Sequence, residues 1–285
     1  VVTQGNPLTQ AYQTPYGVPP FDKIEIKHYE PAILEGIAKH SQEIQEIANN
    51  SEKPTFENTI LAMENSGKLL ASVYTVFGNM NSANTNAKLQ EIAKKVSPEM
   101  SKHSDEIFMN DKLFQRVKAV WESRKSLNLD LQQAKILENS YKKFVRSGAN
   151  LSAKQKEQLK KINSELSLTS LKYGQNLLAE TNKYELVIDK KEDLAGLPSD
   201  LIEAAATTAK EKGKAGKWVF TLSNSSVMPF LQYSENRNLR KEIWNAYQTR
   251  ANHDDASDNK ANAIQLANLR GEKARLLGYK SHADY

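Results

Sequence analysis

Residues 142–198 read KKFVRSGANLSAKQKEQLKKINSELSLTSLKYGQNLLAETNKYELVIDKKEDLAGLP and hold the segment that decides the fold. Ser152 and Gln155 have the spacing of a capping box, and only Gly174 interrupts the run before Thr181. Apolar side chains recur here at helical spacing, at Leu159, Ile162, Leu166 and Tyr173. We predict one long helix, roughly 45 Å at 1.5 Å per residue.

Helical periodicity continues over most of the chain. The predicted helices cover about 28–50, 55–80, 112–124, 130–148, 199–212, 235–250 and 258–277, with a further helical stretch through Leu89 and Ile92. Thr55 is expected to cap a single helix that continues toward Met80. Ser97 and Pro98 are expected to cap and begin a new helix, because proline is favoured at the first helical position.

Two β-branched and aromatic segments, Tyr184–Ile188 and Lys217–Leu222, flank the predicted helix 199–212. They predict a small strand–helix–strand insertion over about 184–222, and whether the two strands pair directly stays open. Residues 1–27 are rich in proline and predict an extended N-terminal arm pinned by its aromatic side chains. The predicted fold class is mainly α, with residues 28–285 forming a multi-helix lobe.

The composition excludes some classes of site and partner. The chain has 285 residues, 39% of them hydrophobic, and a net charge of +5. Acidic and basic side chains alternate along most predicted helices, and the basic cluster 210–217 is interpreted as a helix end and turn, so no nucleic-acid partner is expected. The absence of cysteine excludes disulfides and thiolate metal sites. No apolar run reaches the ~18 residues of a membrane span, and the compartment stays open between cytoplasm and periplasm.

The histidines give no catalytic or metal site. Glu99, His103 and Glu106 share one face of a predicted helix and could bind a divalent metal, but no partner residues match them on other helices. We interpret them as a solvated face. His40 lies on an apolar stripe and is interpreted as a hydrogen-bonded core or boundary residue. No residue is therefore assigned a catalytic, cofactor-binding or metal-binding role.

Two polar loops lack the features of ligand-binding motifs. The segment 253–259 is acidic, but it lacks the alternating oxygen ligands, glycine and terminal glutamate of a calcium loop, so it is interpreted as a loop and helix cap. The segment 213–217 lacks the spacing of a phosphate loop. No Gly-x-Ser-x-Gly sequence is present, so no serine nucleophile is identified.

Short motifs along almost the whole chain resemble one enzyme family. They are Asn6-Pro7-Leu8, Pro19-Pro20-Phe21-Asp22, Pro54-Thr55-Phe56-Glu57-Asn58-Thr59, Arg146-Ser147-Gly148-Ala149, Asp193 to Pro198, Gly216-Lys217-Trp218-Val219-Phe220, Tyr233-Ser234-Glu235-Asn236-Arg237 and Leu276-Leu277-Gly278-Tyr279. Each motif is weak alone, but their order and spacing together resemble the thimet-oligopeptidase-like zinc metallopeptidases, in the peptidyl-dipeptidase Dcp branch.

The resemblance implies a function for the intact protein. Family members bind zinc through two histidines of a His-Glu-x-x-His helix and a later glutamate, and they act on short unfolded peptides. No two histidines of this chain are four residues apart. The resemblance therefore implies the N-terminal helical part of an enzyme that releases C-terminal dipeptides, forming one wall of the substrate cleft.

The end of the chain supports this expectation. Ser281 and Asp284 have the spacing of a cap and its third helical residue, which predicts that a helix starts there and that the catalytic zinc portion is missing after Tyr285. The 285-residue chain alone is then expected to be inactive and free of zinc, and to bind the missing C-terminal portion as a partner. A non-catalytic helical interaction or scaffold module is the alternative function.

Overall fold

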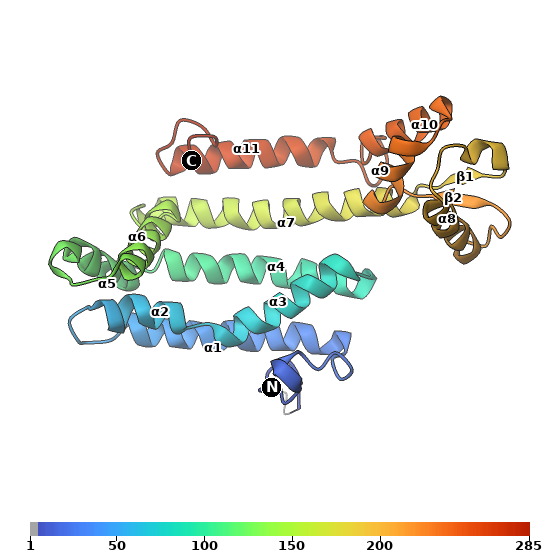
Figure 1. The fold of residues 1–285 in the computed structure, drawn as a ribbon. Coiled ribbons are helices and arrows are strands. Elements are labelled where there is room, and N and C mark those ends of the chain that lie inside the picture. Colours follow the sequence, from blue (N-terminus) through green and yellow to red (C-terminus); the bar gives the residue numbers. More distant parts are fainter. Residues whose placement is uncertain (1–4) are drawn as a thin grey trace. The chain divides into compact units, whose positions relative to one another are not determined.

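The computed structural model describes residues 5–285 (Figure 1). The first four residues of the arm predicted over 1–27 lie outside this range. The chain divides into two compact units. One unit contains the chain up to Leu171 together with Ala267–Tyr285, and the other contains Lys172–Leu266.

The first unit consists of helices. They are α1 (Tyr29–Ala48), a π-helical turn (Phe56–Leu61), α2 (Ala62–Asn65), α3 (Lys68–Ala83), α4 (Ala87–Phe108), α5 (Asp111–Glu122), α6 (Leu131–Arg146), the first part of α7 (Ala153–Lys183) and the last part of α11 (Lys260–Leu276). Helix α1 packs against both α3 and α4. The long helix predicted from residues 142–198 is confirmed as α7, with the backbone N–H of Gln155 donating to Ser152 Oγ.

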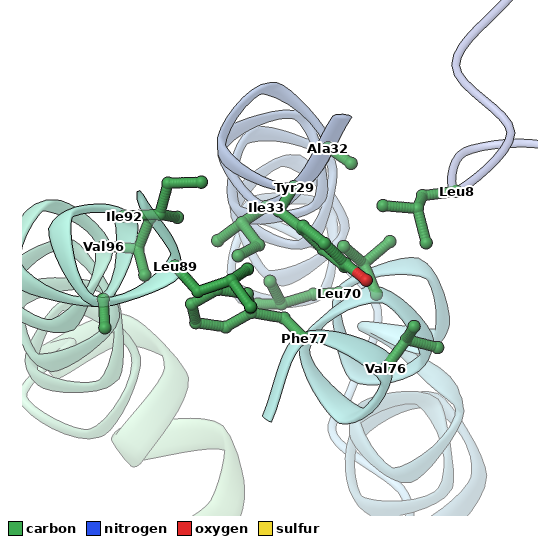
Figure 2. Close-up of a cluster of buried hydrophobic side chains, with 12 residues drawn as sticks. Leu8, Tyr29, Ala32, Ile33, Leu70, Val76, Phe77, Leu89, Ile92 and Val96 are labelled. Atoms are coloured by element: carbon green, nitrogen blue, oxygen red, sulfur yellow. The ribbon is translucent and has the colours of Figure 1, made fainter. Parts of the chain in front are cut away.

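Two apolar clusters form the core of this unit. In the first, Tyr29 and Ile33 of α1 meet Phe77 of α3 and Leu89 of α4 (Figure 2). In the second, Ile44 of α1 and the residues near the end of α4 pack against α5 and α6. A packed set of buried side chains of this size stabilises the helices more than their local propensities do.

The arm is held by different side chains from those predicted. Leu8 is 1% exposed and packs into the first cluster, and Asn6 Nδ2 donates to the carbonyl of His28 at 2.9 Å. Tyr16 and Phe21, by contrast, are exposed. The aromatic anchoring predicted from the sequence is therefore wrong for these two residues, because one buried leucine and one buried amide fix the arm.

Two predicted helix boundaries are wrong. The helix expected from Thr55 to Met80 is interrupted at Ser66 and Gly67, where Gly67 has φ +69° and α3 begins at the next residue. Thr55 does cap the first turn, accepting from the backbone N–H of Asn58. Pro98 begins no new helix and lies inside α4, because buried side chains on both sides of it hold one continuous helix against α1.

The second unit contains the small sheet. Strand β1 (Leu186–Ile188) pairs antiparallel with β2 (Trp218–Phe220), with Leu186 opposite Phe220, so the strands predicted to flank a helix do pair directly. Helix α8 (Ser199–Glu211) lies between them in sequence and packs on β2. Helices α9 (Asn224–Tyr233), which was not predicted, and α10 (Arg237–Gln248) follow, and the end of α7 and the start of α11 also belong to this unit. The predicted fold class, mainly α with a small strand–helix–strand insertion, is confirmed.

Candidate functional site

A partly buried pair of histidines joins two helices of the first unit. His40 projects from α1 and His103 from α4, and His40 Nδ1 lies 2.9 Å from His103 Nε2. The two rings meet edge to face, with centroids 4.9 Å apart. Because His103 is only 4% exposed while Glu99 and Glu106 are exposed, the solvated face predicted for these three residues is wrong for His103.

Hydrogen bonds continue from both ends of the pair. Ser66 Oγ donates to the carbonyl of Met63 at 2.7 Å and lies 3.1 Å from His40 Nε2. At the other end, Ser41 Oγ lies 3.2 Å from His103 Nδ1. All four ring nitrogens therefore have a partner. His40 is half-buried and hydrogen bonded, in agreement with its interpretation as a core or boundary residue.

A cavity of about 290 Å³ adjoins the pair. Its walls are mainly apolar, with hydroxyl groups from Ser66, Ser104 and Ser140, and the exposed Glu64 and Lys143 also line it. Burial lowers the pKa of His103 to about 4, and the charge on His40 acts in the same direction. Burial also lowers the pKa of His40, although Glu43 partly opposes this shift.

Gly67 supports this arrangement from the start of α3. Its backbone N–H donates to Glu43 Oε2 at 2.6 Å, which ties the α2–α3 break to α1. A Cβ at this position would lie 2.9 Å from His40 Nδ1, so only glycine leaves room for the ring. The same residue therefore explains both the interrupted helix and the placement of His40.

A second buried polar group lies on another face of α4. Asn163 Nδ2 donates to Asp105 Oδ1 at 2.7 Å, and Lys273 Nζ donates to Asn163 Oδ1 at 2.8 Å. Burial raises the pKa of Asp105 to about 6, with the bond from Asn163 acting in the opposite direction. Burial lowers the pKa of Lys273, and Asp105 opposes that shift. The three residues join α4, α7 and α11 within the first unit.

The acidic segment 253–259 and the basic cluster 210–217 lie in the second unit. Asp258 accepts from the backbone N–H groups of Asp254 and Lys260, which are contacts of a loop and a helix start. In the basic cluster, Lys212 and Lys214 both pair with Glu185. Among residues 5–285, no group of three or more His, Cys, Asp or Glu side chains is placed to hold a metal ion. No helix in this range is long and apolar enough to cross a membrane.

Comparison with known proteins identifies related enzymes. Residues 230–285 match the model of peptidase family M3. The chain is 38% identical to the dipeptidyl carboxypeptidase of Escherichia coli over 99% of its length, and 37% identical to that of Salmonella typhimurium over 98%. It is 30% identical to the organellar oligopeptidase A of Arabidopsis thaliana, over 98% of its length.

These matches cover only part of the relatives. The chain spans 41% of the length of either bacterial dipeptidyl carboxypeptidase and 35% of the organellar oligopeptidase. The identity is higher to the two dipeptidyl carboxypeptidases than to the oligopeptidase. The resemblance inferred from the motifs, to the thimet-oligopeptidase-like peptidases in their dipeptidyl carboxypeptidase branch, is confirmed.

Proposed function

We propose that this chain, a relative of the family M3 peptidases in their dipeptidyl carboxypeptidase branch, is the N-terminal helical lobe of a zinc metallopeptidase that releases C-terminal dipeptides from short peptides. The observation that carries the proposal is the 38% identity to a dipeptidyl carboxypeptidase along 99% of the chain. A similarity that runs through both units favours a shared fold more than a single matched motif would.

The described residues do not fit a zinc site of their own. A catalytic zinc ion needs three protein ligands and an open position. Within residues 5–285, His40 and His103 are hydrogen bonded to each other, and no carboxylate completes a group of three with them. We therefore propose that zinc, which would supply Lewis-acid chemistry in the intact enzyme, is held by a portion outside this chain.

The proposed contribution of this lobe is to bind and orient. Its helices would form one wall of a cleft that accepts unfolded peptides, so that the scissile bond is aligned before reaction. Correct alignment alone can lower a reaction barrier substantially. Short unfolded peptides and the catalytic portion of the same protein are the proposed partners.

Complementation tests the proposal. A form of the E. coli dipeptidyl carboxypeptidase that lacks the segment aligned with this chain would be mixed with the 285-residue chain, and dipeptide release from an N-terminally blocked tetrapeptide would be measured by mass spectrometry. We expect neither part alone to cut and the mixture to release dipeptides. The 285-residue chain carrying Ile33→Asp serves as the control. This substitution places a charge in the first apolar cluster, so the variant should not restore cleavage.

The scaffold alternative predicts a different result. If the two parts bind each other, the truncated enzyme contains zinc, and no dipeptide is released, the lobe does not complete a peptidase cleft. Failure of the parts to bind would be followed by the same measurement on a single-chain fusion. Inactivity of the fusion would then argue for a non-catalytic interaction module.

A further inference from the structure

The hydrogen bonds around His40 and His103 have only one direction when both rings are neutral. Because Ser66 Oγ donates to the carbonyl of Met63, it accepts from His40, so the hydrogen of His40 is on Nε2. His40 Nδ1 is then an acceptor, and the hydrogen of His103 is also on Nε2. His103 Nδ1 is left to accept from Ser41 Oγ.

This arrangement accepts one additional proton and no more. A proton on His103 Nδ1 can be donated to Ser41 Oγ, since a hydroxyl both donates and accepts, and the bond between the rings is unchanged. A second proton would have to go on His40 Nδ1, which faces the N–H of His103 at 2.9 Å. Two N–H groups would then oppose each other, in addition to two like charges in a buried site.

The surroundings offer the first charge little stabilisation. Glu43, on the same helix as His40, accepts from the backbone of Gly67. Of the groups that line the cavity from α2 and α6, Glu64 is exposed, and Lys143 carries the same sign of charge as an imidazolium. The walls from α3 and α4 contribute Leu70 and Ser104, which carry no charge. Apart from Glu43, which favours the charged form of His40, water is therefore the remaining source of solvation for the charged ring.

The cavity gives water a place to enter. Its volume of about 290 Å³ far exceeds the ~15 Å³ that a cavity needs to hold one water molecule. Ser66, Ser104 and Ser140 line it together with both histidines. Water that solvates an imidazolium here would lie between α1, α3, α4 and α6, in the seam where α1 packs against α3 and α4.

We propose that the His40–His103 pair is a partly buried site for a single proton, and that its occupation in acid draws water from the adjoining cavity onto the charged ring and loosens the packing of α1 against α3 and α4. The site belongs to the first unit alone and does not depend on peptidase activity. It makes the rigidity of this helical unit sensitive to acid. The low pKa of His103 places the response in the acidic range, toward pH 4.

Nitrogen-15 NMR of the labelled chain tests the proton count. At pH 7.5 we expect His40 and His103 both to be neutral with the hydrogen on Nε2. On lowering the pH, we expect one proton to bind to the pair, with a midpoint near 4, well below the value of about 6.5 for a histidine in a model peptide. A midpoint near 6.5, a different tautomer on either ring, or two protons bound to the folded pair would overturn the proposal.

Hydrogen exchange tests the loosening. The matched variant carries His40→Asn and His103→Gln, because these amides place hydrogen-bonding groups near the positions of Nδ1 and Nε2 and do not titrate. We expect the backbone amides of α1 and α4 around the pair to exchange several-fold faster in the native chain than in the variant at pH 4.5, and at equal rates at pH 7.5. If the ratio of native to variant exchange rates is the same at both pH values, the proposed loosening is overturned. If the variant does not fold, the exchange rates of native amides next to the pair are compared with those of α8 at both pH values. An equal acceleration of the two sets in acid would also overturn the loosening.

Discussion

His40 shows how one side chain can connect three separate segments. It links α1 to His103 of α4 and to Ser66, which precedes α3. Its role is therefore structural in the first place, as its position on an apolar stripe indicates. Removing the ring would leave the N–H of His103 without its acceptor in a buried place.

We expect His40→Ala to lower the free energy of unfolding by roughly 1–3 kcal/mol, the usual cost of an unpaired buried polar group. Urea unfolding at pH 7.5 measures it. His282→Ala, at an exposed position, is the control and should have little effect. A loss as small as that of the control would mean that the hydrogen bonds of His40 contribute nothing to stability.

Asp105 should give stability a pH dependence opposite to that of His103. Its folded pKa of about 6 lies above the model value of 3.8, so the folded chain holds more protons between these values. The contribution of Asp105 to stability therefore falls as pH rises from 3.8 to 6. The low pKa of His103 means that the unfolded chain holds more protons between about 4 and 6.5, so its contribution rises over that window.

We expect Asp105→Asn to become more stable relative to the native chain as the pH is raised from 4.5 to 7, because the cost of a buried charge is removed. Urea unfolding at the two pH values provides the comparison. Asp22→Asn makes the same chemical change at an exposed position, and it should change the free energy of unfolding by the same amount at both pH values. A stability difference for Asp105→Asn that does not vary with pH would contradict this account.

At the scale of elements, Gly67 decides where α3 begins. Its positive φ ends the preceding turn, and its missing side chain leaves space for His40. Gly78, which lies inside α3, offers a contrast, since it is exposed and a Cβ there would meet nothing within 4 Å. The same substitution should therefore have opposite effects at the two positions.

We expect Gly67→Ala to destabilise the chain by more than about 1 kcal/mol, since alanine is strained at positive φ and would displace His40. Gly78→Ala should stabilise it by roughly 0.5–1 kcal/mol, because alanine favours a helix interior. Thermal or urea unfolding of the two variants measures both changes in stability and their signs. Equal effects would mean that the break before α3 does not depend on glycine.

At the scale of the whole molecule, the sequence similarity and the described chemistry point in different directions. The relatives are peptidases, while residues 5–285 contain no three-residue metal-binding group. The proposed division of labour, with a helical lobe here and a zinc site elsewhere in the protein, reconciles the two observations. It makes a direct prediction for the isolated chain.

We expect the 285-residue chain to retain no stoichiometric zinc after dialysis, because no set of described side chains can supply three ligands. Elemental analysis after exposure to trace zinc checks this expectation. His103→Gln serves as a comparison, since a zinc ion bound at the histidine pair would be lost in it. One tightly held zinc per chain would contradict the prediction, and its loss in His103→Gln would locate it at the pair.

Local patterns in the sequence were sufficient for most helices and both strands. Apolar periodicity and capping residues act over a few residues, so α7, α6 with its Asp130–Gln133 capping box and the two strand segments could be predicted directly. The resemblance to a peptidase family was likewise present in short motifs and their order. These features require no knowledge of which segments meet in space.

Tertiary structure decided what depends on contacts between distant residues. Nothing in the sequence around His40 or His103 indicates that they meet, because they lie 63 residues apart and their bond forms only when α1 and α4 pack together. The uninterrupted helix through Pro98 has the same cause, since packing of α4 against α1 outweighs the local signal of the proline. Burial then sets the pKa values of His103 and Asp105, and burial is a property of the folded unit, which the sequence alone does not display.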